Sequence, residues 1–535
     1  MILGLFIPNM FRKLGIWQGS LSDFLTSTSS RVHGHGARRR RKISGKADVA
    51  KNQVSKHVRY NNSCWKKIFG SLALNLLACS PLLAEPPSIS SKEASYDGNA
   101  LILKGDVILD HVLGKMHAEN PRLRKEEKHH PFTLIYLNQN VAIELNNHAE
   151  ISCDRAEFDF QNQVGTLLPS IGEKISFVSQ FVEKGGATTP LNLQSARADL
   201  TFSEGQDHEM HISQMHANEA VVIEYGDGYL LRAGSALYEA TESGNFLLAF
   251  PEENETTCHF SYKDDEIEAQ KVRFHPQESL IVLYHPNGVI KSLFAPNEIA
   301  FSAGEMTWNR TESTLTLCHN IHIADSSLGE VYCDEKIEIT TPLSSSSLCD
   351  IQASGKTTIH TFAPGRQTLT CFGLLSFDQK TLTSTFESPQ VDGVVPEGQQ
   401  IEYRSDDLQL LASSGLLEYG WIEGHLRPTR LLLEKDVRLS SAPGAESNQC
   451  AVGDQLTYSL LDHTMTLSAK PGEKVLYWDR VKALAISADQ LRFQKDPFTN
   501  RESVKGVGNV QFSFSSAENT LMKKMFPFYQ PTGEL

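Results

Sequence analysis

Two short stretches of this chain carry residue types that bind nucleotides or metal ions, and neither has the spacing that this chemistry requires. Gly355-Lys356-Thr357 resembles the end of a phosphate-binding loop, but Asp350 stands where the first glycine belongs, and a strand-like Thr-Ile-His follows in place of a helix. His208 and His211 are three residues apart, whereas zinc binding from one helical face uses histidines four apart. We therefore expect no nucleotide site, and a solvated loop at 208–211.

The remaining candidate groups form no catalytic pattern. The acidic run 263–268 is expected to be a solvated entry to a strand, and His129-His130 to lie on a polar loop. No Gly-x-Ser-x-Gly elbow or EF-hand loop occurs in the sequence. We therefore expect a protein that is not an enzyme and that needs no cofactor or metal.

The cysteines after Glu85 are odd in number and form no CxxC pair. They are Cys153, Cys258, Cys318, Cys333, Cys349, Cys371 and Cys450. We interpret them as small buried hydrophobes, with a disulfide among Cys318, Cys333 and Cys349 as the alternative in an oxidising compartment.

Charge is distributed unevenly along the 535 residues. Residues 1–70 carry 14 Lys and Arg against 2 Asp and Glu, which leaves 36 against 62 in the remainder. An acidic body argues against nucleic acid as a partner, because phosphate binding requires a cationic surface. Residues 1–60 are expected to form a disordered basic extension, either solvated or untranslated; binding of a membrane surface or of nucleic acid by this arm is the alternative.

Residues 61–84 are typical of a secretory signal peptide. Lys66-Lys67 precede an apolar run that is short for a bilayer span, and small or apolar residues lead to Ala84. We expect cleavage after Ala84; the alternative is a lipidated Cys79, since Leu76–Cys79 resembles a lipoprotein box. Either route predicts an exported protein in the periplasm, in the second case attached to the outer membrane.

A six-residue pattern recurs in the remainder of the chain: a small residue, two free positions, an apolar residue, a free position and an aromatic residue. Its copies are 91–96, 153–158, 233–238, 269–274, 303–308, 414–419, 453–458 and 488–493, with looser copies that end at Phe202 and Phe377. The apolar and aromatic positions are two apart, so they share one face of a strand. Several neighbouring copies are 34 to 39 residues apart, a period typical of stacked units that bury a core jointly.

The pattern belongs to a larger unit of two strands. Residues 141–159 align without a gap to 221–239, and each unit has an apolar strand, a turn, a second strand, a small residue and the aromatic residue. Turn signals such as Asp97-Gly98 and Asn287-Gly288 separate short alternating runs. We therefore predict an all-β chain, with the insertions 172–189 and 344–357 as edge loops.

Three parts of the chain follow, in whole or in part, one order of elements: a strand that ends in an aromatic residue, a turn, an apolar strand and then a Gly-Asp/Asn-Val element. They are residues 488–493 (ADQLRF) with Gly508-Asn509-Val510, residues 453–458 (GDQLTY), and Tyr96-Asp-Gly98 with Gly105-Asp106-Val107. In this order of elements the chain resembles the OstA-like family, the periplasmic β-jellyroll domains of lipopolysaccharide transport (the LptA, LptC and LptD N-terminal type). The resemblance is good over 88–160 and 430–515 and diffuse over 190–430, where the Gly-Asp/Asn-Val element fades.

The resemblance implies repeated antiparallel strands in an elongated β-jellyroll or V-shaped β-taco, open along one edge, as one roll or as two or more stacked rolls. The expected layout is a β-roll over 88–260, a divergent β-repeat region over 261–430, a second β-roll over 431–520 and a tail over 521–535. The implied partners are lipopolysaccharide or a related glycolipid, other β-roll transport proteins joined by edge-strand pairing, and an outer-membrane translocon.

The candidate residues for a lipid groove are paired apolar positions on these strands. They are Leu101, Leu103, Val141, Ile143, Val221, Ile223, Leu456, Tyr458, Leu491 and Phe493. Residue by residue, the alternation favours an ordinary closed β core, so the lipid groove is an implication of the resemblance. The competing hypothesis for function is a structural or adhesive β-repeat protein of the cell envelope, in which a closed roll presents functional loops.

Overall fold

The computed structural model describes residues 88–513, apart from short gaps at 127–131, 184–185, 187, 206–209, 242–243, 293–297, 327–328, 342–348, 363–366, 407, 423–424, 442–448, 460, 463, 480–483 and 496–501. The expected segments 1–60, 61–84 and 521–535 lie outside the described residues, and so does His129-His130.

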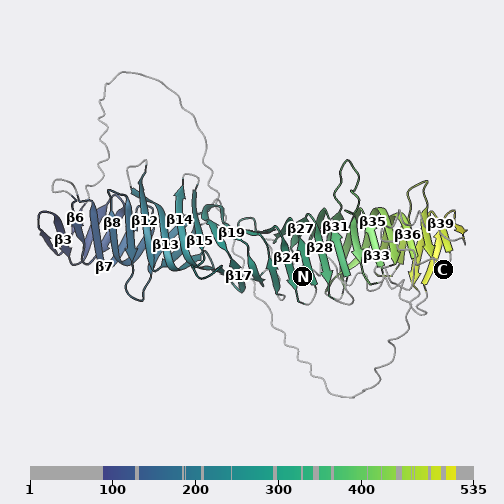
Figure 1. Ribbon diagram of the computed structural model, residues 1–535, viewed down its shortest axis with the longest axis horizontal. Helices are drawn as coiled ribbons and strands as arrows, with labels where there is room; N and C mark the ends of the chain where they lie inside the picture. The colour runs from purple at the N-terminus through teal and green to yellow at the C-terminus, as the bar shows by residue number, and fades with distance from the viewer. Residues whose placement is uncertain are drawn as a thin grey trace, which may run out of the picture. The chain divides into compact units, whose positions relative to one another are not determined.

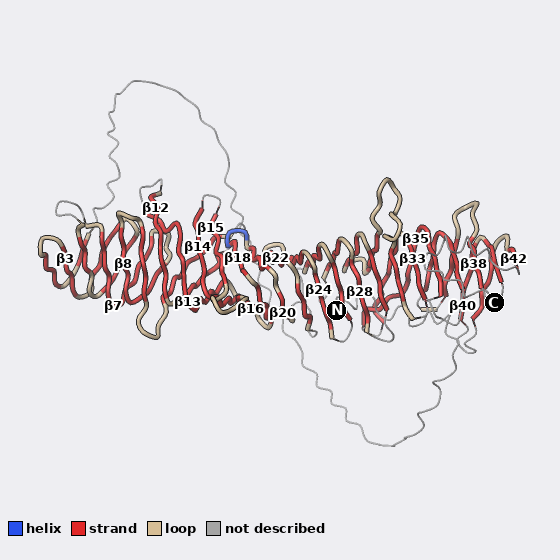
Figure 2. The backbone as a smooth tube through the Cα atoms, in the orientation of Figure 1, coloured by secondary structure: helices blue, strands red, loops and turns tan. Residues whose placement is uncertain are grey.

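Short antiparallel strands make up most of the described chain, which confirms the predicted all-β fold (Figures 1 and 2). All 42 strands belong to one connected hydrogen-bonded network. Within the described residues, the single helical element is the short 3-10 helix η2 (Pro276–Glu278). Along most strands, buried residues alternate with half-buried or exposed ones, which is the period of two that the sequence predicted.

The strand pairings separate into two ladders, which we call wall A and wall B. Eighteen strands lie wholly in wall A: β1 (Ile89–Ser90), β4 (Val107–His111), β5 (Gly114–Ala118), β10 (Ile175–Val182), β11 (Thr188–Ser195), β16 (Cys258–Tyr262), β17 (Asp265–Ala269), β20 (Asn287–Ile290), β21 (Ile299–Ser302), β24 (Ile321–Asp325), β25 (Gly329–Cys333), β28 (Thr357–Thr361), β29 (Gln367–Cys371), β32 (Ile401–Arg404), β33 (Leu408–Ala412), β38 (Val475–Asp479), β39 (Leu484–Ala488) and β42 (Gln511–Ser513). Eighteen lie wholly in wall B: β2 (Glu93–Tyr96), β3 (Ala100–Lys104), β6 (Arg122–Arg124), β9 (Val164–Leu168), β12 (Arg197–Glu204), β15 (Gly244–Phe250), β18 (Lys271–His275), β19 (Leu280–Tyr284), β22 (Glu305–Asn309), β23 (Thr314–Cys318), β26 (Lys336–Thr340), β27 (Asp350–Ser354), β30 (Leu374–Asp378), β31 (Thr383–Glu387), β34 (Ser414–Ile422), β37 (Thr464–Ser468), β40 (Gln490–Lys495) and β41 (Glu502–Val507).

Six longer strands bend and contribute one half to each wall. They are β7 (Leu134–Leu145), β8 (Glu150–Asp159), β13 (Met210–Tyr225), β14 (Tyr229–Thr241), β35 (His425–Ser441) and β36 (Gln449–Ser459). In β7, for example, the first half pairs with β6 in wall B and the second half pairs with β5 in wall A. The two aligned segments, 141–159 and 221–239, lie in the β7–β8 and β13–β14 pairs.

The chain visits each wall with two antiparallel strands and then crosses to the other wall. Because the two strands of a visit are joined by a hairpin, the chain enters and leaves a wall at the same edge. All described crossings therefore lie along one edge, which we call the corner edge, and the hairpins lie along the opposite edge, which we call the mouth edge. The register of β5 against β7, with Gly114 opposite Leu145 next to both hairpins, illustrates this arrangement.

Six crossings along the corner edge share one backbone conformation. Two consecutive residues adopt positive φ at Gly105-Asp106, Gln139-Asn140, Glu219-Ala220, His319-Asn320, Lys435-Asp436 and Gly508-Asn509, and each pair is followed by Val or Ile that begins the next run. The Gly-Asp/Asn-Val element of the sequence is thus the form of this corner that contains glycine. Between 190 and 430 the corner persists with other residues, which explains why the sequence signal fades there.

One connected apolar core fills the space between the walls from Leu103 to Phe493. The expected boundaries at 260/261 and 430/431 fall inside β16 and β35, where strand pairing continues on both sides. Successive segments therefore add to one shared core, as the repeat predicted.

Three local predictions were wrong. Residues 172–189 were expected to form an edge loop, but 175–182 form β10, which pairs with β8 and β11. In the segment 344–357, residues 350–354 form β27. Asn287-Gly288 was expected to be a turn, but both residues lie in β20; a Cβ on Gly288 would lie 2.3 Å from the Glu266 carbonyl oxygen, so glycine allows close strand pairing there.

Candidate functional site

The ten candidate groove residues line the interior between the walls. Nine of them are at most 2% exposed, and Leu101, near the N-terminal end of wall B, is half-buried. Four come together in wall B, where Leu456 and Leu491 flank Leu467, and Tyr458 and Phe493 flank Met465. The other residues are spread along the ladder and share the same connected core.

The interior is closed in this structure. The resemblance implied a roll that is open along one edge, but the inward side chains of both walls are buried against one another. A lipid could therefore enter only if the walls part, because well-packed interiors leave few voids larger than a water molecule. Where the walls can part depends on what holds each edge.

The corner edge is held by backbone hydrogen bonds from one crossing to the next. The Gly304 N–H donates to the His319 carbonyl at 2.7 Å, and the His319 N–H donates to the Glu335 carbonyl at 2.8 Å. Similar bonds join Gly105 to Glu119 and Ser413 to Lys435. Parting the walls along this edge would break these main-chain bonds from crossing to crossing.

The mouth edge is held differently, mainly by side chains. Near the N-terminal end, the His111 ring of wall A lies 4.1 Å from the Phe160 ring of wall B, measured between centroids. Burial lowers the pKa of His111 to about 4, so the ring is neutral near pH 7. One backbone bond also crosses here, from the Met210 N–H to the Val112 carbonyl at 3.1 Å.

A larger cluster closes the mouth farther along the ladder. Glu183 follows β10 in wall A and Arg310 follows β22 in wall B, and Nη1 of the arginine lies 3.4 Å from Oε1 of the glutamate. The guanidinium carbon lies over the rings of Tyr225 and Tyr229, at 5.4 and 5.1 Å from their centroids. Burial alone would raise the pKa of Glu183, but hydrogen bonding by Ser279 and Thr189 and the charge of Arg310 hold it below its ordinary value.

Aromatic rings extend this cluster across the mouth. Tyr262 stacks on Tyr229 with 4.2 Å between centroids and 12° between planes, and Trp308 of wall B meets both rings edge-on. The Tyr225 hydroxyl donates to the Pro276 carbonyl at 3.3 Å. We call these residues, with Glu183 and Arg310, the mouth cluster.

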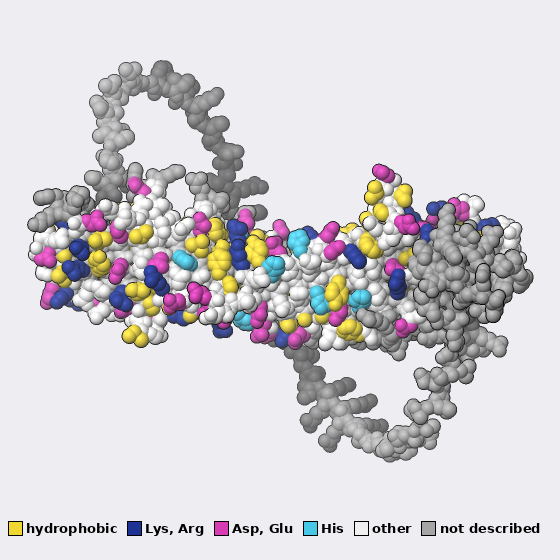
Figure 3. Space-filling view, viewed as in Figure 1, with side chains coloured by type: hydrophobic (Ala, Val, Ile, Leu, Met, Phe, Trp, Pro, Cys, Tyr) yellow, Lys and Arg dark blue, Asp and Glu magenta, His cyan; other side chains and the backbone are white. Residues whose placement is uncertain are grey.

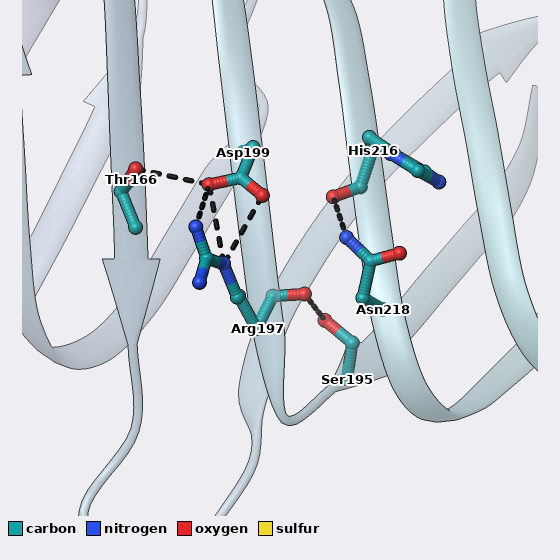
Figure 4. A network of polar contacts seen from close by, with 6 residues as sticks. All are labelled: Thr166, Ser195, Arg197, Asp199, His216 and Asn218. Carbon is teal, nitrogen blue, oxygen red and sulfur yellow. Dashed lines mark hydrogen bonds and ion pairs between the residues drawn. The ribbon is translucent and has the colours of Figure 1, made fainter.

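The polar network of Figure 4 lies on the outer face of wall B. Asp199 of β12 accepts hydrogen bonds from Thr166 at 2.9 Å and from Arg197 at 3.0 Å. His216 is the cross-strand neighbour of Asp199, but its ring points away from the carboxylate (Figure 4). Burial alone would raise the pKa of Asp199, but these hydrogen bonds lower it. The network joins the neighbouring strands β9 and β12 through side-chain hydrogen bonds, so it can stabilise the wall.

The other sequence candidates also have structural roles. Gly355-Lys356-Thr357 forms a corner between β27 and β28. The expected loop at 208–211 is wrong for residues 210 and 211, which lie in β13, and His208 lies outside the described residues. Asp265, expected in a solvated run, is fully buried and accepts hydrogen bonds from the Lys291 and Ser292 N–H groups at 2.7 and 2.8 Å. Alternation could have indicated this, because Asp265 shares its face with Ile267. No cluster of metal-ligating side chains occurs among the residues that the structure describes.

None of the seven described cysteines forms a disulfide, and this includes Cys318, Cys333 and Cys349. Most are buried, and burial raises the pKa of the Cys153 and Cys258 thiols to about 12. Such thiols are poor nucleophiles, as expected for small residues of a core.

The outer surface carries charges of both signs, scattered over the visible face (Figure 3). Apolar side chains are exposed at both ends of the ladder: Ile89 and Tyr96 at one end, and Val504, Val507 and Phe512 at the other. Strands β2 and β41 pair with a described strand on one side only. No helix in the described part of the chain has the length and apolarity needed to cross a membrane.

A comparison with protein-family models finds no match to this chain, and a comparison with curated proteins finds none either.

Proposed function

We propose that this protein is an exported, non-enzymatic lipid-binding β-roll that carries or bridges lipopolysaccharide, or a shorter lipo-oligosaccharide, across the periplasm to the outer membrane. The supporting observation is the difference between the two edges of the roll. Apolar inner faces run the length of the ladder, one edge is joined by backbone bonds, and the other is closed by side chains. A roll of this kind can open along its mouth without unfolding.

The interior has the chemistry and length that acyl chains require. Burying a methylene group yields about 0.8 kcal/mol. Each wall stacks strands at a spacing of about 4.8 Å, so 24 strands or half-strands make a ladder on the order of 110 Å long. When the acyl chains of a lipid take the place of one wall against the other, the inward side chains keep apolar contacts, because the inner faces of both walls are apolar.

The ends of the ladder support the bridging part of the proposal. The edge strands carry exposed apolar side chains next to main-chain groups that can accept a partner's strand. Pairing there would continue both walls, and the trough between them, into a neighbouring β-roll protein or an outer-membrane translocon.

Photo-crosslinking on the two faces of one strand tests this function. A benzophenone amino acid would replace Tyr458, which faces the interior, or Thr457, which faces outward on the same strand β36. After irradiation of cells that make the full chain, we expect a glycolipid adduct by mass spectrometry at 458 and none at 457. No adduct at 458, or equal adducts at both positions, would contradict the proposal.

A structural or adhesive β-repeat protein is the second candidate, and the tight packing of the interior favours it. In that case the loops and outer faces would carry the function, and the interior would never exchange its contacts. Surface labelling of intact cells separates the two candidates, because a bridge beneath the outer membrane is shielded from an impermeant reagent.

A further inference from the structure

Arg310 lies where the two walls meet at the mouth. Its ion pair with Glu183 joins residues that are 127 positions apart in the chain and belong to opposite walls. The pair is partly exposed, at 23% for the Arg310 side chain and 13% for Glu183. Solvent therefore reaches the guanidinium, while its other face rests on the Tyr225 and Tyr229 rings.

The surroundings of Arg310 are shaped to hold a guanidinium. Gly226, in the hairpin between β13 and β14, has a φ of +54°, and a Cβ at this position would lie 3.1 Å from Nη1 of Arg310. The Arg310 backbone N–H donates to the Ser279 carbonyl at 3.0 Å, which fixes the start of the side chain. Thr189 donates to Glu183, so the carboxylate is oriented from within wall A.

A second cation lies over the same group of stacked aromatic rings. Nζ of Lys263, in the hairpin between β16 and β17, lies 4.8 Å from the centroid of Tyr262. Tyr262 stacks on Tyr229, which lies beneath Arg310. Two cations thus stand at the mouth above rings that continue into the apolar interior through Trp308 and Phe274.

We propose that Arg310 binds the phosphate group of an amphiphile whose acyl chains enter between the walls, and that Glu183 holds Arg310 in its place when no lipid is bound. This inference rests on the proposed function and adds a recognition residue to it. Arginine binds phosphate through two parallel N–H···O bonds, and a phosphate carries more charge than the carboxylate that it would displace. Exchange of Glu183 for phosphate would also release the wall-to-wall contact, so that head-group binding and opening of the mouth become one event.

The test compares binding of two probes to the full chain: phosphorylated lipid A and the same lipid after removal of its phosphates. We expect the wild type to prefer the phosphorylated form by about tenfold or more, the range of a charge-assisted bond. Arg310→Ala should abolish this preference, and the dephosphorylated form should bind at least as tightly as it binds the wild type, because the ion pair that joins the walls is gone. Arg310→Lys should retain part of the preference, and Glu183→Gln should increase affinity for the phosphorylated form, because the competing carboxylate is gone.

Arg273→Ala is the matched control. Arg273 also lies over an aromatic ring, with 4.9 Å to the Phe246 centroid, but it alternates with the inward Phe274 and faces outward on wall B. Its replacement should leave the preference intact. Inorganic phosphate at the concentration of the lipid should not displace the lipid; if it does, the site recognises free phosphate and the assignment to a lipid is wrong.

Failure of the inference is distinguishable from failure of the proposed function. If the wild type binds both lipids equally, or if Arg310→Ala and Glu183→Gln keep the wild-type preference, the role of Arg310 is refuted while lipid binding stands. If the wild type binds neither lipid, the proposed function is refuted, and this inference with it.

Discussion

The two edges of this β-roll have opposite constructions. Along the corner edge, main-chain N–H and carbonyl groups bond from crossing to crossing, as at Gly304, His319 and Glu335. Along the mouth edge, the contacts between walls are mainly rings and charged groups, such as His111 with Phe160 or Arg310 with Glu183. Backbone bonds are the same whatever the sequence, whereas side-chain contacts can be exchanged for a ligand. The proposal that the roll is hinged at its corner and opens at its mouth rests on this difference.

Replacing leucines on strand β23 should give the largest measurable difference in stability between the two edges. Leu315 is near the mouth and Leu317 is near the corner, and both side chains are at most 2% exposed. A buried Leu→Ala substitution costs about 2–5 kcal/mol, with the higher values where the surroundings cannot collapse. We expect Leu317→Ala to fall in the upper part of this range and Leu315→Ala to cost about 1 kcal/mol less, because the mouth can relax around the cavity. Denaturant unfolding measures both.

Thr316 is the control for this pair, since it lies between the two leucines and points outward. Thr316→Ala should change the free energy of unfolding by about 0.5 kcal/mol or less. Equal costs at Leu315 and Leu317 would mean that both edges are equally rigid, and the hinge would lose its support.

The sequence predicts the corner edge well because that edge repeats. The small residue of the six-residue pattern is where a strand bends from one wall to the other, as at Cys153, Ala233 and Gly453. Each of these residues pairs with the valine that follows a positive-φ pair, for example Val141 with Cys153. A bend that must recur at every crossing leaves the same residue types at the same spacing, so the pattern is visible in one sequence.

The mouth could not be predicted in this way. Glu183 and Arg310 are brought together by the stacking of many intervening strands, and no local pattern connects them. Residues 172–189 were mistaken for a loop because turn residues such as Gly172 and Gly186 flank the alternating run of β10. The inward positions were predictable from alternation, but alternation does not distinguish a packed interior from one that receives a lipid.

Acidification should weaken the N-terminal part of the mouth before the corner. Burial lowers the pKa of His111 from 6.5 to about 4, so the unfolded chain binds this proton more tightly than the folded protein does. The stabilisation is complete above about pH 6.5 and is lost as the pH falls towards 4, with an upper bound of about 3 kcal/mol at about 1.4 kcal/mol per pKa unit. Thermal or urea unfolding between pH 7 and pH 4 measures this slope.

His111→Gln isolates the contribution of this ring. Glutamine cannot titrate, and its amide oxygen can accept the bond that Nδ1 of His111 accepts from the Leu113 N–H at 3.3 Å. The pKa of His275 is also lowered by burial, so the variant should keep a weaker slope rather than none. An unchanged slope would show that His111 is already exposed to protons in the folded protein.

The smallest expected effect concerns the corner itself. Asn320 has a φ of +51° and follows His319, which also has positive φ, in the corner between β23 and β24. Asparagine tolerates this region, whereas the β-branched side chain of valine clashes with its own backbone there, so Asn320→Val should cost about 1–2 kcal/mol. Asn320→Gly should be close to neutral, because glycine adopts this conformation freely but loses more entropy on folding. Hydrogen exchange of the His319 and Asn320 amides, which donate to the Glu335 and Asp334 carbonyls, reports whether the loss is local to the corner. If valine were tolerated while those amides stayed protected, the corner would have backbone freedom, and opening of the roll would not be confined to the mouth.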